Sequence, residues 1–137
     1  MKTSILALLL SLGAVFVGAS IPYCDTSVDA ALATAAAARK LVVVSLGREM
    51  CGRCQKFYAL MASQQLVFDP AKCTYLKFDV DNLEHREYFY SWVEPPDRRL
   101  PFVAVVDPSA GTGTCLSAAC VLPELRTFLG PLVQPAP

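Results

Sequence analysis

The feature that most constrains the fold is the sequence CGRC at 51–54, which stands where a strand gives way to a helix. The apolar run at 41–46 predicts a buried strand, and the apolar spacing over 54–65 predicts a helix. Free backbone N–H groups and the positive end of the helix dipole favour an anion at such a junction. We therefore expect the Cys51 thiol to ionise readily, and the thiolate is the form that attacks disulfides. With two residues between them, Cys54 can close a small disulfide ring with Cys51, so the motif predicts redox chemistry.

The remaining pattern predicts a single α/β domain built on one central sheet. The 137 residues suffice for one domain of ordinary size and are too few for two. Helix and strand alternate up to a turn rich in Ser, Gly and Thr, after which a last strand and a last helix follow. We expect these elements, in order, at 25–39, 41–46, 54–65, 74–80, 83–92, 102–106, from 114, and at 123–129. We expect residues 21–130 to form the domain and residues 131–137 a disordered tail.

The connection between the first two strands predicts their relative direction. A crossover through the helix at 54–65 makes the strand near Cys73 parallel to the strand at 41–46. Cys24 precedes the helix at 25–39 and so lies at the end of the sheet that carries the motif, whereas Cys73 lies at the opposite end. A helix of about 13 residues separates the two by roughly 20 Å, beyond the ~7 Å limit for a disulfide. We predict that Cys24 and Cys73 do not pair.

The first twenty residues, 1–20, have the pattern of a secretory signal peptide. Lys2 precedes a largely apolar, uncharged run at 5–17, and small residues allow cleavage near Ala19 or Ser20. An uncleaved membrane anchor is the alternative, although the run is shorter than the roughly 20 residues that a spanning helix needs. All six cysteines follow the cleavage point, which fits an oxidising compartment. We expect a secreted, periplasmic or secretory-pathway lumenal protein.

Other functional classes have little support in the sequence. The formal net charge is zero, which gives no electrostatic footprint for nucleic acid. The chain has no phosphate-binding loop, no G-x-S-x-G motif and no paired carboxylates, so we expect no hydrolase, no nucleotide enzyme and no cofactor. The one histidine, His85, stands in a charged stretch at 84–87 that indicates a solvated helix face, so we expect no metal there. In the same helix Leu83, Phe89 and Trp92 are candidates for burial.

Together with the order of elements, three segments make residues 25–130 resemble the thioredoxin superfamily. They are CGRC at 51–54 with Glu49 just before it, KFDVD at 77–81 and RLPFV at 99–103. The resemblance implies a thioredoxin-like fold, with a central mixed β-sheet of about four strands flanked by helices. It also implies that Leu100 and a cis Pro101 present backbone groups to a bound peptide. An ordinary proline that opens a strand is the alternative.

Four positions depart from the thioredoxin pattern. Ser45 stands where thioredoxins have a buried aspartate, Gly47 and Met50 stand where they have tryptophans, and Arg53 replaces the proline of the motif. That aspartate is understood to help deprotonate the resolving cysteine, which Ser45 cannot do. The charge of Arg53 favours the Cys51 thiolate and stabilises the reduced form; an ordinary exposed arginine is the alternative. We therefore expect a weak reductase with a reduction potential less negative than that of thioredoxin.

The function that these features predict is thiol–disulfide exchange on proteins or peptides outside the cytosol. Cys51 would attack a substrate disulfide, and Cys54 would then release the reduced product. The expected auxiliary and substrate-binding residues are Gly52, Arg53, Leu100 and Pro101. The expected partners are protein or peptide thiols and disulfides and a redox partner, with no nucleic acid, and a membrane only if the first segment is retained. The alternative is a secreted binding or structural module on the same scaffold, with CGRC locked as a stable disulfide.

Cys115 and Cys120 are candidates for a structural disulfide. If the segment is an extended strand, the five steps between them span roughly 16 Å and exclude a bond. If it is a loop, the bond forms easily. We predict the disulfide, because an exported chain rarely leaves nearby thiols free. A zinc site shared with the motif cysteines is a weaker alternative, since the spacing is unusual for zinc ligands.

Overall fold

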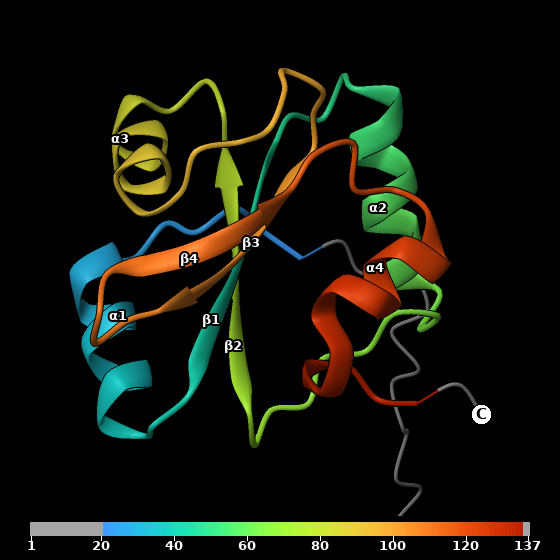
Figure 1. Ribbon diagram of the computed structural model, residues 1–137. Coiled ribbons are helices and arrows are strands. Elements are labelled where there is room, and N and C mark those ends of the chain that lie inside the picture. The colour runs from blue at the N-terminus through green and yellow to red at the C-terminus, as the bar shows by residue number, and fades with distance from the viewer. Residues whose placement is uncertain (1–20, 136–137) are drawn as a thin grey trace, which may run out of the picture.

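The computed structural model describes residues 21–135, which fold into a three-layer α/β domain. Within these residues, four strands form one sheet in the order β2-β1-β3-β4, and four α-helices cover its two faces (Figure 1). In chain order the elements are α1 (Val28–Ala37), β1 (Leu41–Gly47), α2 (Gly52–Ala62), β2 (Cys73–Asp79), α3 (Leu83–Trp92), β3 (Phe102–Asp107), β4 (Thr112–Leu116), α4 (Leu122–Leu129) and the 3-10 turn η1 (Gly130–Leu132). The predicted fold class, α/β with a central mixed sheet of about four strands, is confirmed.

Strand β1 lies in the middle of the sheet, and this position explains its apolar composition. It pairs with β2 in parallel and with β3 in antiparallel, and β3 pairs with β4 in antiparallel. The crossover through α2 therefore runs as predicted. A strand covered on both faces must be apolar at successive positions rather than at alternate ones. Accordingly, Val42, Val43, Val44 and Leu46 are all fully buried.

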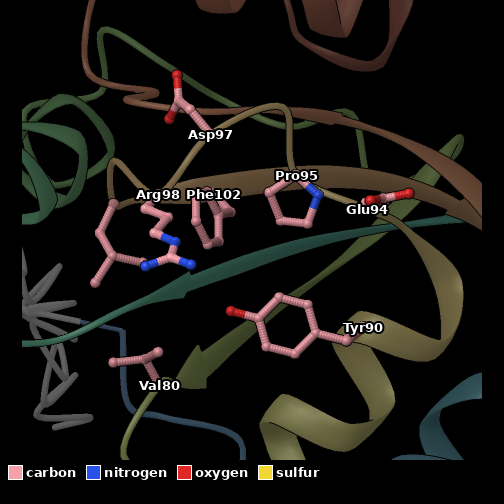
Figure 2. A pocket seen from close by; sticks show the side chains of 8 residues that line it. Val80, Tyr90, Glu94, Pro95, Asp97, Arg98 and Phe102 are labelled. Carbon is pink, nitrogen blue, oxygen red and sulfur yellow. The ribbon is translucent and has the colours of Figure 1, made fainter.

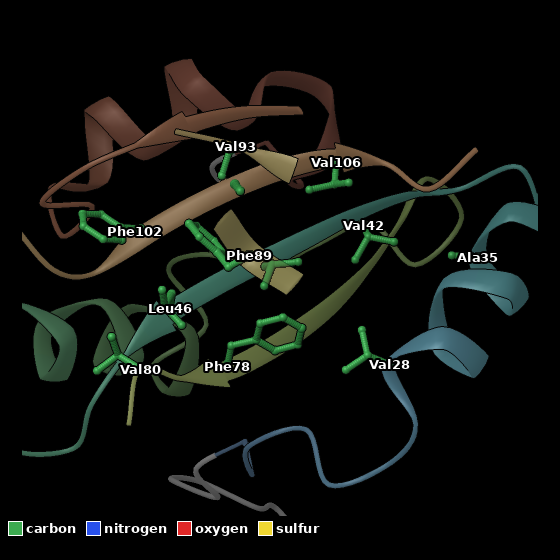
Figure 3. Packing of buried hydrophobic residues seen from close by; sticks show 12 residues of the cluster. Val28, Ala35, Val42, Leu46, Phe78, Val80, Phe89, Val93, Phe102 and Val106 are labelled. Atoms are coloured by element: carbon green, nitrogen blue, oxygen red, sulfur yellow. The ribbon is translucent and has the colours of Figure 1, made fainter. Parts of the chain in front are cut away.

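Two apolar clusters hold the helices on opposite faces of the sheet. Helices α1 and α3 lie on one side and α2 and α4 on the other (Figure 1). Successive strand residues point to opposite faces, so Val42 and Leu46 join Phe89 of α3 in the first cluster (Figure 3). Val43 joins Phe57 of α2 in the second. This packing holds the first turn of α2 at the carboxyl end of β1.

Side chains at the helix starts satisfy backbone groups that the helices leave free. Ser27 Oγ accepts a hydrogen bond from Ala30 N at 3.2 Å and caps α1. Asn82 Oδ1 accepts one from His85 N at 3.2 Å and caps α3. Caps of this kind stabilise a helix by about 1 kcal/mol each.

The prediction of a disordered tail from residue 131 is wrong as far as residue 135. Leu132 and Val133 are buried with 7% and 8% exposure. Val133 forms an isolated antiparallel bridge with Phe68, and Gln134 N donates to Val67 O at 2.8 Å. The turn residues end α4, but the two apolar side chains after them still complete the second cluster.

The predicted burial pattern of α3 is also partly wrong. Leu83 is 60% exposed, whereas His85, expected on a solvated face, is 5% exposed. The His85 ring stacks on Phe78 with centroids 4.5 Å apart, and its Nδ1 accepts a hydrogen bond from Asp79 N at 2.9 Å. His85 and Phe89, four residues apart, share the face that meets the sheet. The imidazole is accommodated there because its Nδ1 has a backbone partner.

Two predictions concern segments at the ends of the chain. The predicted signal peptide, 1–20, and the last two residues, 136–137, lie outside the described residues. Between residues 21 and 135, no helix is both long enough and apolar enough to cross a membrane.

Candidate active site

The Cys51 sulfur occupies the cap position at the start of α2. Cys51 has extended backbone angles, φ −100° and ψ 122°, and its Sγ accepts a hydrogen bond from Cys54 N at 3.3 Å. Helices usually place an oxygen of Ser, Thr, Asp or Asn at this point, where free N–H groups favour negative charge. The sequence prediction that the first cysteine lies at the strand–helix junction is therefore confirmed.

The two thiols of the motif have opposite environments. Cys51 is half-buried and Cys54 fully buried, and both are free thiols. Burial alone would raise the pKa of Cys51. However, the Cys54 thiol and the backbone N–H groups of Cys54 and Arg53 donate hydrogen bonds to its sulfur, and the charge of Arg53 lies nearby. Together these groups outweigh burial and lower the pKa of Cys51. Burial raises the pKa of Cys54 to about 12, and its hydrogen bond to Cys51 contributes to the rise. Cys51 is thus the better nucleophile and Cys54 the protonated, shielded partner.

The segment before β3 lies against the motif. The Leu100–Pro101 peptide bond is cis, as the resemblance implied. Arg53 Nε donates a hydrogen bond to Leu100 O at 2.7 Å. Pairing of Leu46 with Phe102 brings the start of β3 to the end of β1, where the motif begins. Arg53 therefore joins the motif to the cis-proline segment and is more than an ordinary exposed arginine.

The Ser45 side chain belongs to a buried, neutral pair. Ser45 is fully buried, and its Oγ lies 2.6 Å from Tyr75 Oη in a hydrogen bond. Burial raises the pKa of Tyr75, so this pair carries no charge near neutral pH. No carboxylate occupies the position, in agreement with the sequence analysis.

A buried lysine beside the motif was missed by the sequence analysis. Lys77 is the cross-strand neighbour of Ser45, and its side chain is 3% exposed. Its Nζ donates to Glu49 Oε1 at 3.0 Å and to Ile21 O at 3.1 Å. These bonds offset the cost of burying the charge. The hydrogen bond from Lys77 lowers the pKa of Glu49, whose side chain is otherwise largely exposed. The available signal was strand alternation, which places Lys77 on the same face as Tyr75.

Two tyrosines enclose the Lys77 ammonium. It lies 4.1 Å from the ring centroid of Tyr58 and 4.2 Å from that of Tyr23, both within the range of cation–π attraction. Both hydroxyls are buried, and neither has a hydrogen-bond partner among residues 21–135. Burial raises the pKa of Tyr23 to about 12 and that of Tyr58 still more. A β-carbon on Gly47 would lie 2.8 Å from Tyr58 Oη and 2.9 Å from Cys54 Sγ, so the glycine makes room for both.

The predicted disulfide between Cys115 and Cys120 is not formed in the structure, where both are free thiols. Cys115 lies in β4 opposite Ala104, and its side chain packs against the first cluster, on the α1 and α3 side. Cys120 lies beyond the strand, directly before α4. Cys115 thus lies in an extended strand, which is the arrangement for which the sequence analysis excluded a bond to Cys120.

The remaining cysteines do not supply a metal site. Among residues 21–135, no group of three or more His, Cys, Asp and Glu side chains could hold a metal ion, so the zinc alternative has no support there. Cys24 N donates to Lys77 O near the motif end of β2, and Cys73 begins that strand at the opposite end. The two cysteines thus lie at opposite ends of the sheet and are not bonded to each other, as predicted, and both are free thiols.

Comparisons with models of known protein families and with curated proteins found no match. Among solved structures, the chain is similar to a mutant thioredoxin from Halobacterium salinarum NRC-1. The two share 15% sequence identity over 74% of this chain and 83% of that one, with a TM-score of 0.47. The site itself is defined by the geometry of this chain's own residues.

Proposed function

We propose that this protein is a thiol–disulfide oxidoreductase that acts on protein or peptide disulfides through Cys51 and Cys54. The observation that carries the proposal is the contrast within the motif: a partly exposed sulfur at a helix N-terminus with a lowered pKa, and a buried thiol directly behind it. That arrangement suits an attacking and a resolving cysteine.

The exchange proceeds in two displacements. The Cys51 thiolate bonds to one sulfur of the substrate disulfide, the substrate S–S bond breaks, and the other substrate sulfur leaves and takes up a proton. Cys54 then loses its proton and attacks Cys51 Sγ, which breaks the mixed disulfide and frees the second substrate thiol. Two electrons pass from the protein to the substrate, and the protein retains a Cys51–Cys54 disulfide. Of the two protons that the product thiols carry, the Cys54 thiol supplies one and the solvent supplies the other, because Cys51 reacts as a thiolate. Run in reverse, the same steps oxidise a substrate dithiol.

The flanking residues have auxiliary roles in this proposal. Leu100 and Pro101 would present backbone groups to the substrate chain beside the mixed disulfide. Arg53 would favour the Cys51 thiolate, and its bond to Leu100 O holds the two segments together. Gly52 is exposed, and no other residue lies within 4 Å of where its β-carbon would be, so it leaves the approach to Cys51 open.

Insulin reduction coupled to dithiothreitol tests the proposal. We expect the wild type to accelerate insulin precipitation, the Cys51→Ser variant to lose the acceleration, and a Cys73→Ser control to keep it. A wild type no faster than Cys51→Ser would overturn the assignment.

A second candidate is a binding or structural module with CGRC as a permanent disulfide. The neutral Ser45–Tyr75 pair favours it, because Cys54 then has no buried base on that side. The reduction potential separates the two: a stable structural disulfide lies below about −300 mV. For the oxidoreductase we expect a value less negative than the roughly −270 mV of thioredoxin.

We also propose that the protein works outside the cytosol, in an extracellular, periplasmic or lumenal space. The signal-like pattern at 1–20 and the six cysteines after it support this. N-terminal sequencing of the mature protein, with cleavage expected near Ala19 or Ser20, tests it.

A further inference from the structure

A cavity of about 450 Å³ opens beside the cis-proline segment (Figure 2). Its walls come from the end of β2, the end of α3, the connection that follows α3, and the start of β3. The apolar side chains that line it are Val80, Tyr90, Pro95, Leu100 and Phe102. A cavity of this size and composition holds one large apolar side chain.

The aromatic wall of the cavity is unusually open to solvent. Tyr90 is 50% exposed, although its ring packs edge-on against Phe89 at 5.9 Å between centroids. Figure 2 shows Tyr90, Pro95 and Phe102 around the opening. Within residues 21–135 nothing covers the exposed part of Tyr90, so its ring is available to a ligand. Aromatic rings bind other rings and aliphatic chains through large buried areas and specific packing.

Leu100 connects this cavity to the motif. Its side chain lines the cavity, while its carbonyl oxygen accepts the 2.7 Å hydrogen bond from Arg53. Arg53 in turn contributes to the lowered pKa of Cys51. A substrate chain joined to Cys51 and lying along Leu100 therefore has its neighbouring side chains beside the cavity.

The charges near this path are those of Arg53, in the motif, and of Arg98, Asp97 and Glu94, which line the cavity. Within residues 21–135, neither Arg53 nor Arg98 forms an ion pair with a carboxylate. Asp97, although it borders the cavity, is occupied by Arg99 at 2.7 Å. Figure 2 shows Glu94 on the side of the cavity away from Arg98. A carboxylate on the ligand would thus find the charge of Arg98, which lines the cavity, and that of Arg53, whose Nε donates to Leu100 O.

We infer that this cavity is a substrate subsite: it takes an aromatic or large apolar side chain next to the reacting cysteine, in a segment that also carries a carboxylate for Arg98 and Arg53. The inference rests on the proposed thiol–disulfide exchange. It assigns the substrate class as acidic, aromatic-bearing cysteine segments of proteins or peptides.

Rates of exchange with defined disulfides test this subsite. Reduced protein is mixed with glutathione mixed disulfides of four short peptides, which carry Phe or Ser beside the cysteine and Glu or Lys at the next position. The neutral hydroxyethyl disulfide, too small to fill the cavity, reports exchange itself. We expect the Phe–Glu peptide to react about tenfold faster than the Ser–Lys peptide, with the Glu-over-Lys part weakening at high salt.

Two variants locate the preference. In Tyr90→Ser, the exchange rate with the Phe peptides should fall close to the rate with the Ser peptides. In Arg98→Gln, the exchange rate with the Glu peptides should fall close to the rate with the Lys peptides. The matched controls Leu83→Ser and Arg86→Gln, exposed positions of α3 outside the cavity, should keep both ratios. Circular dichroism confirms that each variant is folded.

The outcomes separate this inference from the proposed function. Equal rates for the four peptides, with hydroxyethyl disulfide still reacting, overturn the subsite and leave the exchange activity standing. Ratios that persist in both variants place the preference elsewhere and also overturn it. Failure of the wild type to react with any disulfide overturns the exchange activity and the subsite together.

Discussion

Cys51 and Cys73 each begin a regular element at opposite ends of the central sheet. At Cys51 the sulfur receives hydrogen bonds from the Cys54 thiol and from backbone N–H groups, and with the charge of Arg53 these outweigh burial and lower the pKa of the thiol. At Cys73 the sulfur points at carbonyl oxygens instead, those of Asp69 and Leu132, each 3.6 Å away. Burial, and then the Asp69 charge, raises the pKa of Cys73.

The comparison teaches that the polarity of the surrounding backbone, as well as burial, decides what a cysteine does. The start of α2 directs free N–H groups toward Cys51. The turn before β2 and the last residue of η1 present C=O groups to Cys73, which a thiol can satisfy only while it keeps its proton. The surroundings of one sulfur favour its thiolate, and the other sulfur is packed as a small core residue.

The largest expected effect is the difference in alkylation between these two ends. In reduced protein at pH 7, we expect iodoacetamide to modify Cys51 at least about 100-fold faster than Cys73 or Cys54, because reactivity follows thiolate fraction and access. A lowered pKa keeps Cys51 ionised to lower pH, so its rate should fall off only in that lower range. Peptide mass spectrometry measures the rates. Similar rates at all three sites would refute the contrast, and rates in denaturant should converge.

The next effect tests how tightly the motif end is packed. Gly47→Ala should destabilise the protein by about 1–3 kcal/mol, because the new methyl group meets Tyr58 Oη and Cys54 Sγ at under 3 Å. Adding Tyr58→Phe should recover part of the loss. Gly52→Ala is the control, since its β-carbon would meet nothing within 4 Å. Urea unfolding measures all three; a harmless Gly47→Ala would show that the site is looser than described.

A smaller effect concerns the neutral Ser45–Tyr75 pair. Ser45→Asp places a carboxylate across the strand from the Lys77 ammonium, where it can accept the Cys54 proton. We expect insulin reduction to rise severalfold and the reduction potential to become more negative. Ser45→Asn, which adds similar bulk without a charge, is the control. If both variants behave alike, the missing carboxylate does not limit the reaction.

The smallest effect is that of the motif arginine. Arg53→Gln should raise the pKa of Cys51 slightly, because Arg53 is exposed and its charge is screened by solvent. We expect alkylation of Cys51 to slow about two- to fourfold at pH 7, with the pH profile shifted upward. The matched variant Lys56→Gln, an exposed lysine in the same helix, should leave the profile in place. A profile that does not move in Arg53→Gln would leave the Cys54 thiol and the backbone N–H groups responsible for the lowered pKa.

Local patterns were sufficient for the elements and for the motif. The apolar run of β1 and the helical spacing after CGRC predicted both elements within a few residues. The position of Cys51 at the helix start followed from those two elements alone. The cis Pro101 came instead from the resemblance to a known superfamily, since the residues around it are compatible with either isomer.

The residues that were misjudged owe their positions to distant partners. His85 is buried because its ring stacks on Phe78 and its Nδ1 accepts a hydrogen bond from Asp79 N, both on another element. Leu132 and Val133 are ordered because a second cluster needs them. A local charge pattern or a run of turn residues carries no information about such partners.

By itself, the sequence determined the α/β class, the strand–helix junction and the placement of two cysteines there, because each depends on short-range periodicity and on a helix terminus. Only the tertiary structure decided that Lys77 is buried beside the motif, since its charge is tolerated through Glu49, Ile21 O and two tyrosine rings far apart in the chain. It also decided that a cavity opens at Leu100, because that space is enclosed by elements whose meeting depends on the packing of the whole sheet.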